Sequence, residues 1–323
     1  MLALAALGAS GCGLGSSPGS GEVTLTVTRD FGSAKLASIA QSKVPRSETV
    51  LRMLQGSFPV RSTVATGHGG GSVESIDGVQ GDASSTSGTP QSWFYYVNGI
   101  KAAADAASTM VHRGDRIWWD LHDPSATYFV PAIVGSFPEP FVHGIGGKRL
   151  PTTVECAPDL RAACARVSGA LAAAGVPAAS QLLGTGSGTQ TLGVVLGTWS
   201  ELQSQVGARL IEHGPSTSGV YARFSGPGYR SLELLDPRGQ VVRTLHAGAG
   251  LIAATADRSS EPTWLVTGTD AAGVLAAARA LTAARLHDAF ALAVQDSTDL
   301  PVPLQAPRVA HAASRAGVPL PLR

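Results

Sequence analysis

WFYYVNGIKAAADAASTMVHRGDRIWW, residues 93–119, decides the fold, because it concentrates large aromatic residues in a chain whose aromatic content is only 6%. The aromatic run at 93–97 predicts a short strand. That strand ends at Asn98-Gly99, a pair that readily supplies the positive φ angles of a tight turn. A second turn signal, Gly114-Asp115, precedes a predicted strand at 116–121. We therefore interpret the chain outward from two strands rich in tryptophan and tyrosine.

The second of these strands has two different faces. Because side chains alternate along a strand, Ile117 and Trp119 share one face, which predicts a side turned toward the core. The other face carries Trp118 between two charged residues, Arg116 and Asp120. We therefore expect Trp118 to meet solvent or a ligand rather than the core.

The first strand is apolar on both faces. Trp93 and Tyr95 alternate with Phe94 and Tyr96, which is more aromatic surface than a one-sided sheet requires. Two alternatives follow from this pattern. Either both faces are covered, one of them by a second domain, or one face is a platform for a flat ligand such as a macrocycle or a sugar.

Three motifs in this part of the chain carry a resemblance to a known family. SVESIDGV (residues 72–79), WFYYVNG (93–99) and GDRIWW (114–119) resemble, in order and spacing, the transcobalamin C-terminal-like domain of many bacterial surface proteins. The resemblance covers residues 22–124. It implies a small β-grasp-like domain, which in the vertebrate cobalamin carriers covers one side of a corrinoid. The helical barrel that forms the other half of those carriers is not recognisable in this sequence.

Composition places broad limits on function. With 323 residues, 44% of them hydrophobic, the chain is long enough for two domains with a sizeable core. Its formal net charge of +1 argues against a partner held by bulk charge, whether a nucleic acid or an anionic membrane surface. We therefore expect no nucleic-acid partner.

The first residues resemble the end of a bacterial lipoprotein signal. Residues 1–12, MLALAALGASGC, are apolar and end in small residues before Cys12, the position that cleavage would leave for lipidation. No basic residues precede this run, which is consistent with a start codon placed too far downstream. Residues 13–21 are typical of a flexible tether. We expect an extracytoplasmic protein, lipid-anchored to the cell membrane through Cys12; a buried helix start with a chance cysteine is the alternative.

The other two cysteines, Cys156 and Cys164, fit an exported protein. If Cys156 ends a strand and Cys164 lies about two turns into the next helix, the chain folds back far enough for a disulfide. Metal binding is the alternative, although no second Cys or His pair stands at ligand spacing.

The chain divides into a β-grasp-like domain at 22–124, a connector at 125–149, a second domain at 150–296 and a loose proline-rich tail at 297–323. The prolines of the connector indicate a segment that runs across the interface between the domains. The predicted fold class is α+β or α/β, with a small β-grasp-like domain followed by a mixed, partly parallel α/β sandwich.

The second domain repeats a unit of strand, Gly-Thr turn and helix. The two units, at Gly197 and Gly268, imply a sheet that is at least partly parallel and covered by helices. Thr198 and Glu201 have the spacing of a capping box, which predicts a helix that continues through about Glu212. Another helix is predicted at 271–286.

Few residues indicate catalysis. The histidines are scattered, and no H-x-x-x-H pair is present. We expect no catalytic residues, no metal and no cofactor. The helix N-termini that follow the Gly-Thr turns leave an anion site open as an alternative. The glycine run at 67–71 is either a loop that lets backbone approach a ligand or an ordinary hairpin loop.

We expect a binding role. The candidate ligand-binding residues combine aromatic rings with a nearby histidine and small loop residues: Trp93, Tyr95, Trp118, His122, Gly70 and Ser72. By resemblance the ligand is a corrinoid such as cobalamin, held between the domains and passed to an importer. The first alternative is a cell-surface adhesion or scaffold module that binds protein or wall glycan. An enzyme in the second domain is a third alternative.

Overall fold

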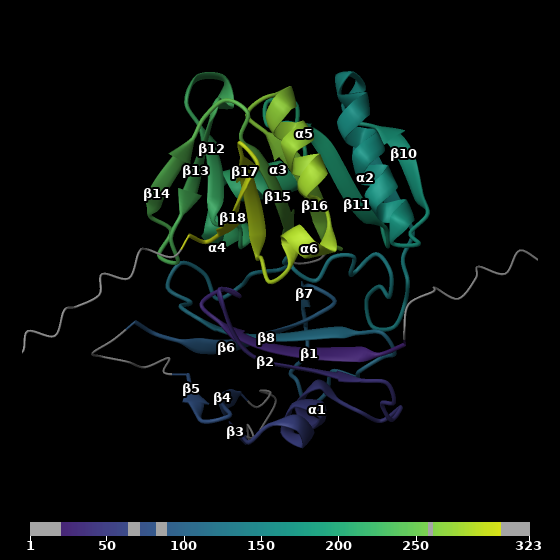
Figure 1. The fold of residues 1–323 in the computed structure, drawn as a ribbon, viewed down its shortest axis with the longest axis vertical. Coiled ribbons are helices and arrows are strands. Elements are labelled where there is room, and N and C mark those ends of the chain that lie inside the picture. The colour runs from purple at the N-terminus through teal and green to yellow at the C-terminus, as the bar shows by residue number, and fades with distance from the viewer. Residues whose placement is uncertain (1–20, 64–71, 82–88, 258–260, 305–323) are drawn as a thin grey trace, which may run out of the picture.

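The structure is a computed structural model that describes residues 21–63, 72–81, 89–257 and 261–304. Its two main sheets lie one above the other in Figure 1. We call the part of the fold built around the five-stranded sheet, in the order β2-β1-β8-β6-β7, the lower domain. The part built around the seven-stranded sheet, in the order β10-β9-β11-β16-β15-β17-β18, is the upper domain. The predicted mixed and partly parallel α/β fold class is confirmed.

The lower sheet is built on two parallel central strands, β1 (Val23–Arg29) and β8 (Arg116–His122). Antiparallel neighbours flank them, namely β2 (Ala34–Gln41), β6 (Ser92–Val97) and β7 (Ile100–Lys101). One face packs against α1 (Val50–Ser57), with a small sheet of β3 (Val60–Ser62), β4 (Val73–Ile76) and β5 (Val79–Gln80) beside it. A helix on such a mixed sheet is the predicted β-grasp-like arrangement.

The predicted turn at Asn98-Gly99 is confirmed and joins β6 to β7. Both residues have positive φ angles, 54° and 74°, as a two-residue hairpin turn of this kind requires. Glycine is needed at the second position for a further reason, since a Cβ there would lie 2.8 Å from the carbonyl oxygen of Ile133. The hairpin therefore fits closely against the connector.

The upper sheet combines parallel and antiparallel pairing. Four strands run parallel to one another: β9 (Thr152–Cys156), β10 (Ala178–Leu182), β11 (Leu192–Thr198) and β16 (Thr263–Gly268). Three more extend the sheet with antiparallel pairing: β15 (Gly250–Thr255), β17 (Ala291–Gln295) and β18 (Thr298–Val302). The two predicted strand-turn-helix strands, β11 and β16, are direct parallel neighbours.

Both faces of the upper sheet are covered. One face packs against α2 (Arg161–Ala173), preceded by η1 (Pro158–Leu160), and against α5 (Ala271–Ala280). The other packs against α3 (Val206–Glu212) and a three-stranded sheet of β12 (Ala222–Ser225), β13 (Ser231–Leu235) and β14 (Val241–Leu245). Short helices complete the domain: α4 (Pro215–Ser218), η2 (Pro227–Tyr229) and α6 (Ala283–Leu286).

Three predicted elements have different bounds. The Glu201 carboxylate accepts a hydrogen bond from the backbone N–H of Thr198 at 2.8 Å, yet residues 199–204 form turns and α3 begins only at Val206. The predicted helix at 271–286 is broken, because Thr282 caps a separate α6. Residues 298–302 of the predicted loose tail form β18, which pairs with β17.

The predicted disulfide is confirmed. Cys156 is the last residue of β9 and Cys164 lies in the first turn of α2, so that their Cα atoms are 6.1 Å apart. The bridge fastens the start of the helix to the sheet that it covers.

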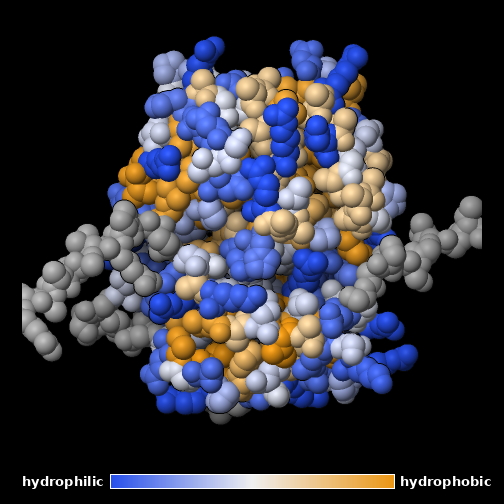
Figure 2. Space-filling model, viewed as in Figure 1, coloured by the Kyte–Doolittle hydropathy of each residue, from blue (hydrophilic) through white to orange (hydrophobic). Residues whose placement is uncertain are grey.

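The connector runs across the interface, as predicted. It is largely buried, with Ile133 and Phe141 fully enclosed. Its backbone bonds to both domains: Pro131 accepts from the N–H of Lys101 at 3.0 Å, and Val134 donates to the carbonyl of Phe290 at 3.1 Å. On the face shown in Figure 2, hydrophilic side chains gather along the junction between the two domains.

Aromatic side chains from both domains meet at the interface. We call them the interface cluster: Phe31, Phe94, Tyr96, Trp118, His122, Tyr221 and Phe290. Phe31 and Phe94 each stack on His122 with ring centroids 4.3 Å apart. Phe290, from the upper domain, meets Trp118 edge-on at 5.6 Å. The two domains thus share one hydrophobic core.

The expectation that Trp118 lies outside the core and meets solvent is wrong, whereas its ligand role stays a prediction. Trp118 is only 4% exposed, because the upper domain covers this face of the lower sheet. Its indole Nε1 donates to the Thr28 hydroxyl at 2.6 Å. The neighbouring charge of Asp120 is also buried and accepts hydrogen bonds from the backbone N–H groups of Phe31 and Gly32. Flanking charge therefore did not indicate exposure.

Trp118→Ala is expected to lower the free energy of unfolding by about 3–5 kcal/mol, because it removes a buried indole and leaves a cavity between the domains. Chemical denaturation followed by circular dichroism measures this change. Tyr128→Ala is the control, since Tyr128 is 62% exposed and its truncation is expected to cost much less. A loss no larger than that of the control would show that Trp118 is not part of the core.

Candidate functional site

A hollow with a volume of about 960 Å³ opens at the domain junction, and we call it the interface cleft. The β6–β7 hairpin and the segment that follows it form the lower wall, while Ala256, Asp257, Glu261 and Pro262 form the upper wall. The connector also lines the cleft, with residues such as Tyr128, Phe129 and Pro131. Most of the lining is apolar and includes Val97, Ile100, Met110, Tyr128, Phe129 and Ile145. The cleft thus has the mostly apolar lining typical of ligand pockets.

Asn98 holds the lower wall together. Its side-chain Nδ2 donates to Asp115 Oδ1 at 2.8 Å and to the carbonyl of Gly144 at 2.9 Å, and its Oδ1 accepts from the N–H of Arg116. Asn98 is only 1% exposed, so these bonds are shielded from water. The hairpin turn, the β8 start and the connector are therefore fixed relative to one another.

His143 fixes the connector beside this wall. Its backbone N–H and its ring Nδ1 both bond to the carboxylate of Glu139, at 2.8 and 2.6 Å. The hydrogen bond with Glu139 raises the pKa of His143 above the ordinary histidine value. Gly114, with a φ of 81°, allows the ring to approach, since a Cβ there would lie 2.2 Å from His143 Nε2.

Three large apolar side chains of the cleft are exposed. Tyr128 is 62% exposed, Met110 40% and Phe129 36%. Phe94 of the interface cluster meets the Tyr128 ring edge-on at 6.2 Å. Exposed apolar groups gathered around a hollow mark a surface that gains free energy when a ligand covers it.

The cleft also contains charged groups on opposite walls. Lys101 lies on the lower wall with its Nζ 4.8 Å from the ring centroid of Phe94, and burial lowers its pKa. Asp257 and Glu261 lie on the upper wall. A ligand in this cleft therefore meets an apolar surface with a cationic and an acidic end.

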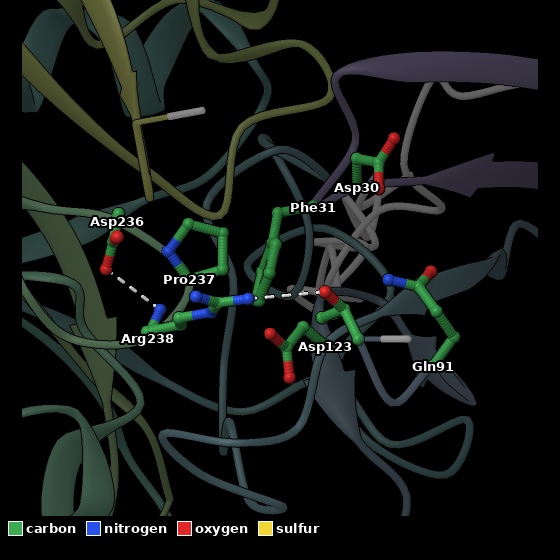
Figure 3. Close-up of a pocket in the computed structure, with 8 residues that line it drawn as sticks. Asp30, Phe31, Gln91, Asp123, Asp236, Pro237 and Arg238 are labelled. Carbon is green, nitrogen blue, oxygen red and sulfur yellow. Dashed lines mark hydrogen bonds between the residues drawn. The ribbon is translucent and has the colours of Figure 1, made fainter. Parts of the chain in front are cut away.

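A smaller side pocket of about 360 Å³ opens at another part of the junction (Figure 3). It lies between the β13–β14 turn, which carries Asp236 and Arg238, and lower-domain residues that include Asp123. Two of its polar side chains, Arg238 and Asp123, already bond within the chain. The Arg238 guanidinium donates to Thr89 at 3.4 Å, and Asp123 accepts from the N–H of Ser125 at 2.8 Å. The interface cleft is the stronger candidate, since it is larger and more apolar.

None of the predicted ligand-binding residues that the structure describes lines the interface cleft. Trp93 and Tyr95 pack on the opposite face of the sheet, toward α1, and the Tyr95 hydroxyl donates to the carbonyl of Ala104 at 2.6 Å. His122 is buried in the interface cluster, and Ser72 is exposed before β4. Gly70 and Cys12 lie outside the described residues. A ligand role for these residues stays a prediction.

Sequence reasoning missed the residues that do line the cleft. Lys101 and Met110 lie in the polar and alanine-rich segment between the two aromatic strands, where no motif marks them. The adjacent pair Tyr128-Phe129 was a usable signal, because two large aromatic residues stand in a segment already predicted to cross the interface.

The described residues contain neither a metal-binding cluster nor a membrane-spanning helix. No three His, Cys, Asp or Glu side chains there gather closely enough to hold a metal ion. In the same residues, no helix combines the length and the apolar composition needed to cross a membrane.

Comparison with known proteins identifies part of the lower domain. Residues 47–123 match a family model described as a domain of unknown function, DUF4430. Among solved structures, the chain is similar to one described as a "putative metal binding protein" from Ruminococcus gnavus ATCC 29149, with 20% identity and a TM-score of 0.26. That match covers 32% of this chain and 96% of the other, and at this TM-score it carries no argument. No curated protein matches the chain. The transcobalamin-like resemblance stays a prediction.

His143→Gln is expected to destabilise the protein more at acidic than at alkaline pH. Because the folded-state pKa of His143 is raised, protonated His143 stabilises the fold below the unfolded pKa of about 6.5, and this contribution is lost as pH rises through the folded value. Thermal melting of both proteins between pH 5 and pH 9 measures the difference. An equal difference at both ends of that range would contradict the assignment.

Proposed function

We propose that the protein binds a small amphipathic molecule in the interface cleft. The observation that carries this proposal is the exposure of Tyr128, Phe129 and Met110 around a hollow of about 960 Å³. Ligand pockets of proteins range from about 300 to 1,000 Å³. Each 100 Å² of apolar area that a ligand removes from water contributes about 2.5 kcal/mol, so that a few such contacts support stable binding.

A corrinoid such as cobalamin is the first ligand to test. A flat macrocycle with apolar faces and a polar rim suits a cleft whose aromatic residues stand beside charged ones. The resemblance of the lower domain to the transcobalamin C-terminal-like domain supports the same ligand class. In this proposal the role is capture without catalysis, followed by transfer to an importer.

Tyr128→Ala is expected to weaken ligand binding about tenfold, or about 1.4 kcal/mol, because the exposed ring contributes contact area without supporting the core. Titration with cobalamin, followed by the corrin absorbance band, and with the neutral dye N-phenyl-1-naphthylamine, followed by fluorescence, measures affinity and stoichiometry. Leu182→Ala is the control, since Leu182 is 68% exposed but lies outside the cleft.

The outcomes separate the alternatives. If the dye saturates at one equivalent but cobalamin does not, binding in the cleft is supported and a corrinoid is rejected as the ligand. Failure of both to saturate would reject binding in the cleft. Retention on isolated cell wall in that case would favour the adhesion alternative.

We further propose that Cys12 carries a lipid that anchors the protein outside the cytoplasm. The apolar run before Cys12 and the Gly- and Ser-rich residues 13–21 after it support this proposal.

Cys12→Ser is expected to move the protein from the membrane fraction to the soluble fraction, because acylation requires the cysteine thiol. Cell fractionation with metabolic labelling by a fatty-acid analogue measures this change. The double variant Cys156→Ser and Cys164→Ser is the control, because it keeps Cys12 and is therefore still expected to be labelled. Labelling that survives Cys12→Ser would contradict the anchor.

A further inference from the structure

We propose that the interface cleft selects amphipathic organic anions, whose carboxylate, phosphate or sulfonate group is bound by Lys101. This inference rests on the proposed binding in the cleft and adds the class of ligand. The same chemistry would serve any anion whose apolar body covers Tyr128 and Phe129.

The fold places Lys101 firmly. It ends β7 and pairs with Tyr96 across the hairpin, and its backbone N–H donates to the carbonyl of Pro131 at 3.0 Å. Its ammonium group lies 4.8 Å from the ring centroid of Phe94 and 6.0 Å from that of Phe129. The ammonium group thus lies over the faces of both rings, which attract a cation without neutralising its charge, and Lys101 itself lines the cleft.

Within the part of the chain that the structure describes, the ammonium group of Lys101 has no partner of opposite charge. Among the described residues, no carboxylate forms an ion pair with it and no side chain or carbonyl accepts a hydrogen bond from it. Burial alone lowers its pKa, with no offset from a nearby acid. A partly desolvated cation without a partner is costly, so a bound anion gains from restoring the missing charge and hydrogen bonds.

The opposite wall sets the orientation of the ligand. Asp257 and Glu261 line the same cleft, and Asp257 already interacts within the chain. Their carboxylates repel an anion at the upper wall, whereas Lys101 attracts it at the lower wall. The apolar body of the ligand would then lie over Tyr128 and Phe129 at the opening.

Two fluorescent probes that share the same ring system but differ in charge test this inference. 1-Anilinonaphthalene-8-sulfonate carries a sulfonate that N-phenyl-1-naphthylamine lacks. Lys101→Met is expected to raise the Kd of the sulfonate about tenfold and to change that of the neutral probe by less than about twofold. Lys101→Arg is expected to retain most of the preference for the sulfonate. Thermal melting verifies that each variant is folded.

Two further variants serve as controls. Lys43→Met removes an exposed positive charge outside the cleft and is expected to leave both probes unchanged. Tyr128→Ala is expected to weaken both probes alike, which would place them in the cleft.

The possible failures are distinct. If both probes bind the wild-type protein but Lys101→Met leaves their ratio unchanged, anion selection by Lys101 is wrong while binding in the cleft stands. If neither probe saturates on the wild-type protein, the proposed function fails and the inference falls with it. If Lys43→Met weakens the sulfonate as much as Lys101→Met does, the preference arises from general charge and not from this site.

Discussion

The two domains meet where an aromatic stack of the lower domain, His122 between Phe31 and Phe94, packs against the upper domain. Phe290 of the upper domain closes this stack edge-on, with ring centroids 5.4 Å from His122. Aromatic pairs of this kind contribute both buried area and a preferred geometry. Through Phe290 the lower-domain stack packs against the upper domain, within the hydrophobic cluster that the two domains share.

A buried carboxylate holds two members of this stack in place through hydrogen bonds. Asp120 is completely buried and bonds to His122 Nδ1 at 2.7 Å as well as to the backbone of the turn that carries Phe31. That turn holds Asp30 and Phe31 at positive φ angles of 56° and 57°, a conformation unusual for residues other than glycine. The hydrogen bonds to Asp120 stabilise this turn and place the Phe31 ring against the upper domain.

Local patterns predicted what local physics determines. The turn at Asn98-Gly99 follows from backbone preference, and the disulfide follows from the short distance between a strand end and the next helix. The burial of Trp118 was not predictable in this way, because its cover comes from Phe290, distant in the sequence. The cleft is equally nonlocal, because its walls come from the hairpin, the connector and residues such as Asp257 and Glu261, which are distant from one another in the sequence.

The shared core has a consequence for modularity. Because Phe94, Tyr96 and Trp118 are buried against residues such as Tyr221 and Phe290, the lower sheet has no finished outer face of its own on that side. Cutting the chain at the connector would expose this apolar face to water and make the separated domain prone to aggregate. Any other protein that contains this sheet must therefore cover the same face with an apolar segment of its own. The sheet and the segment that covers it are thus expected to be gained or lost together.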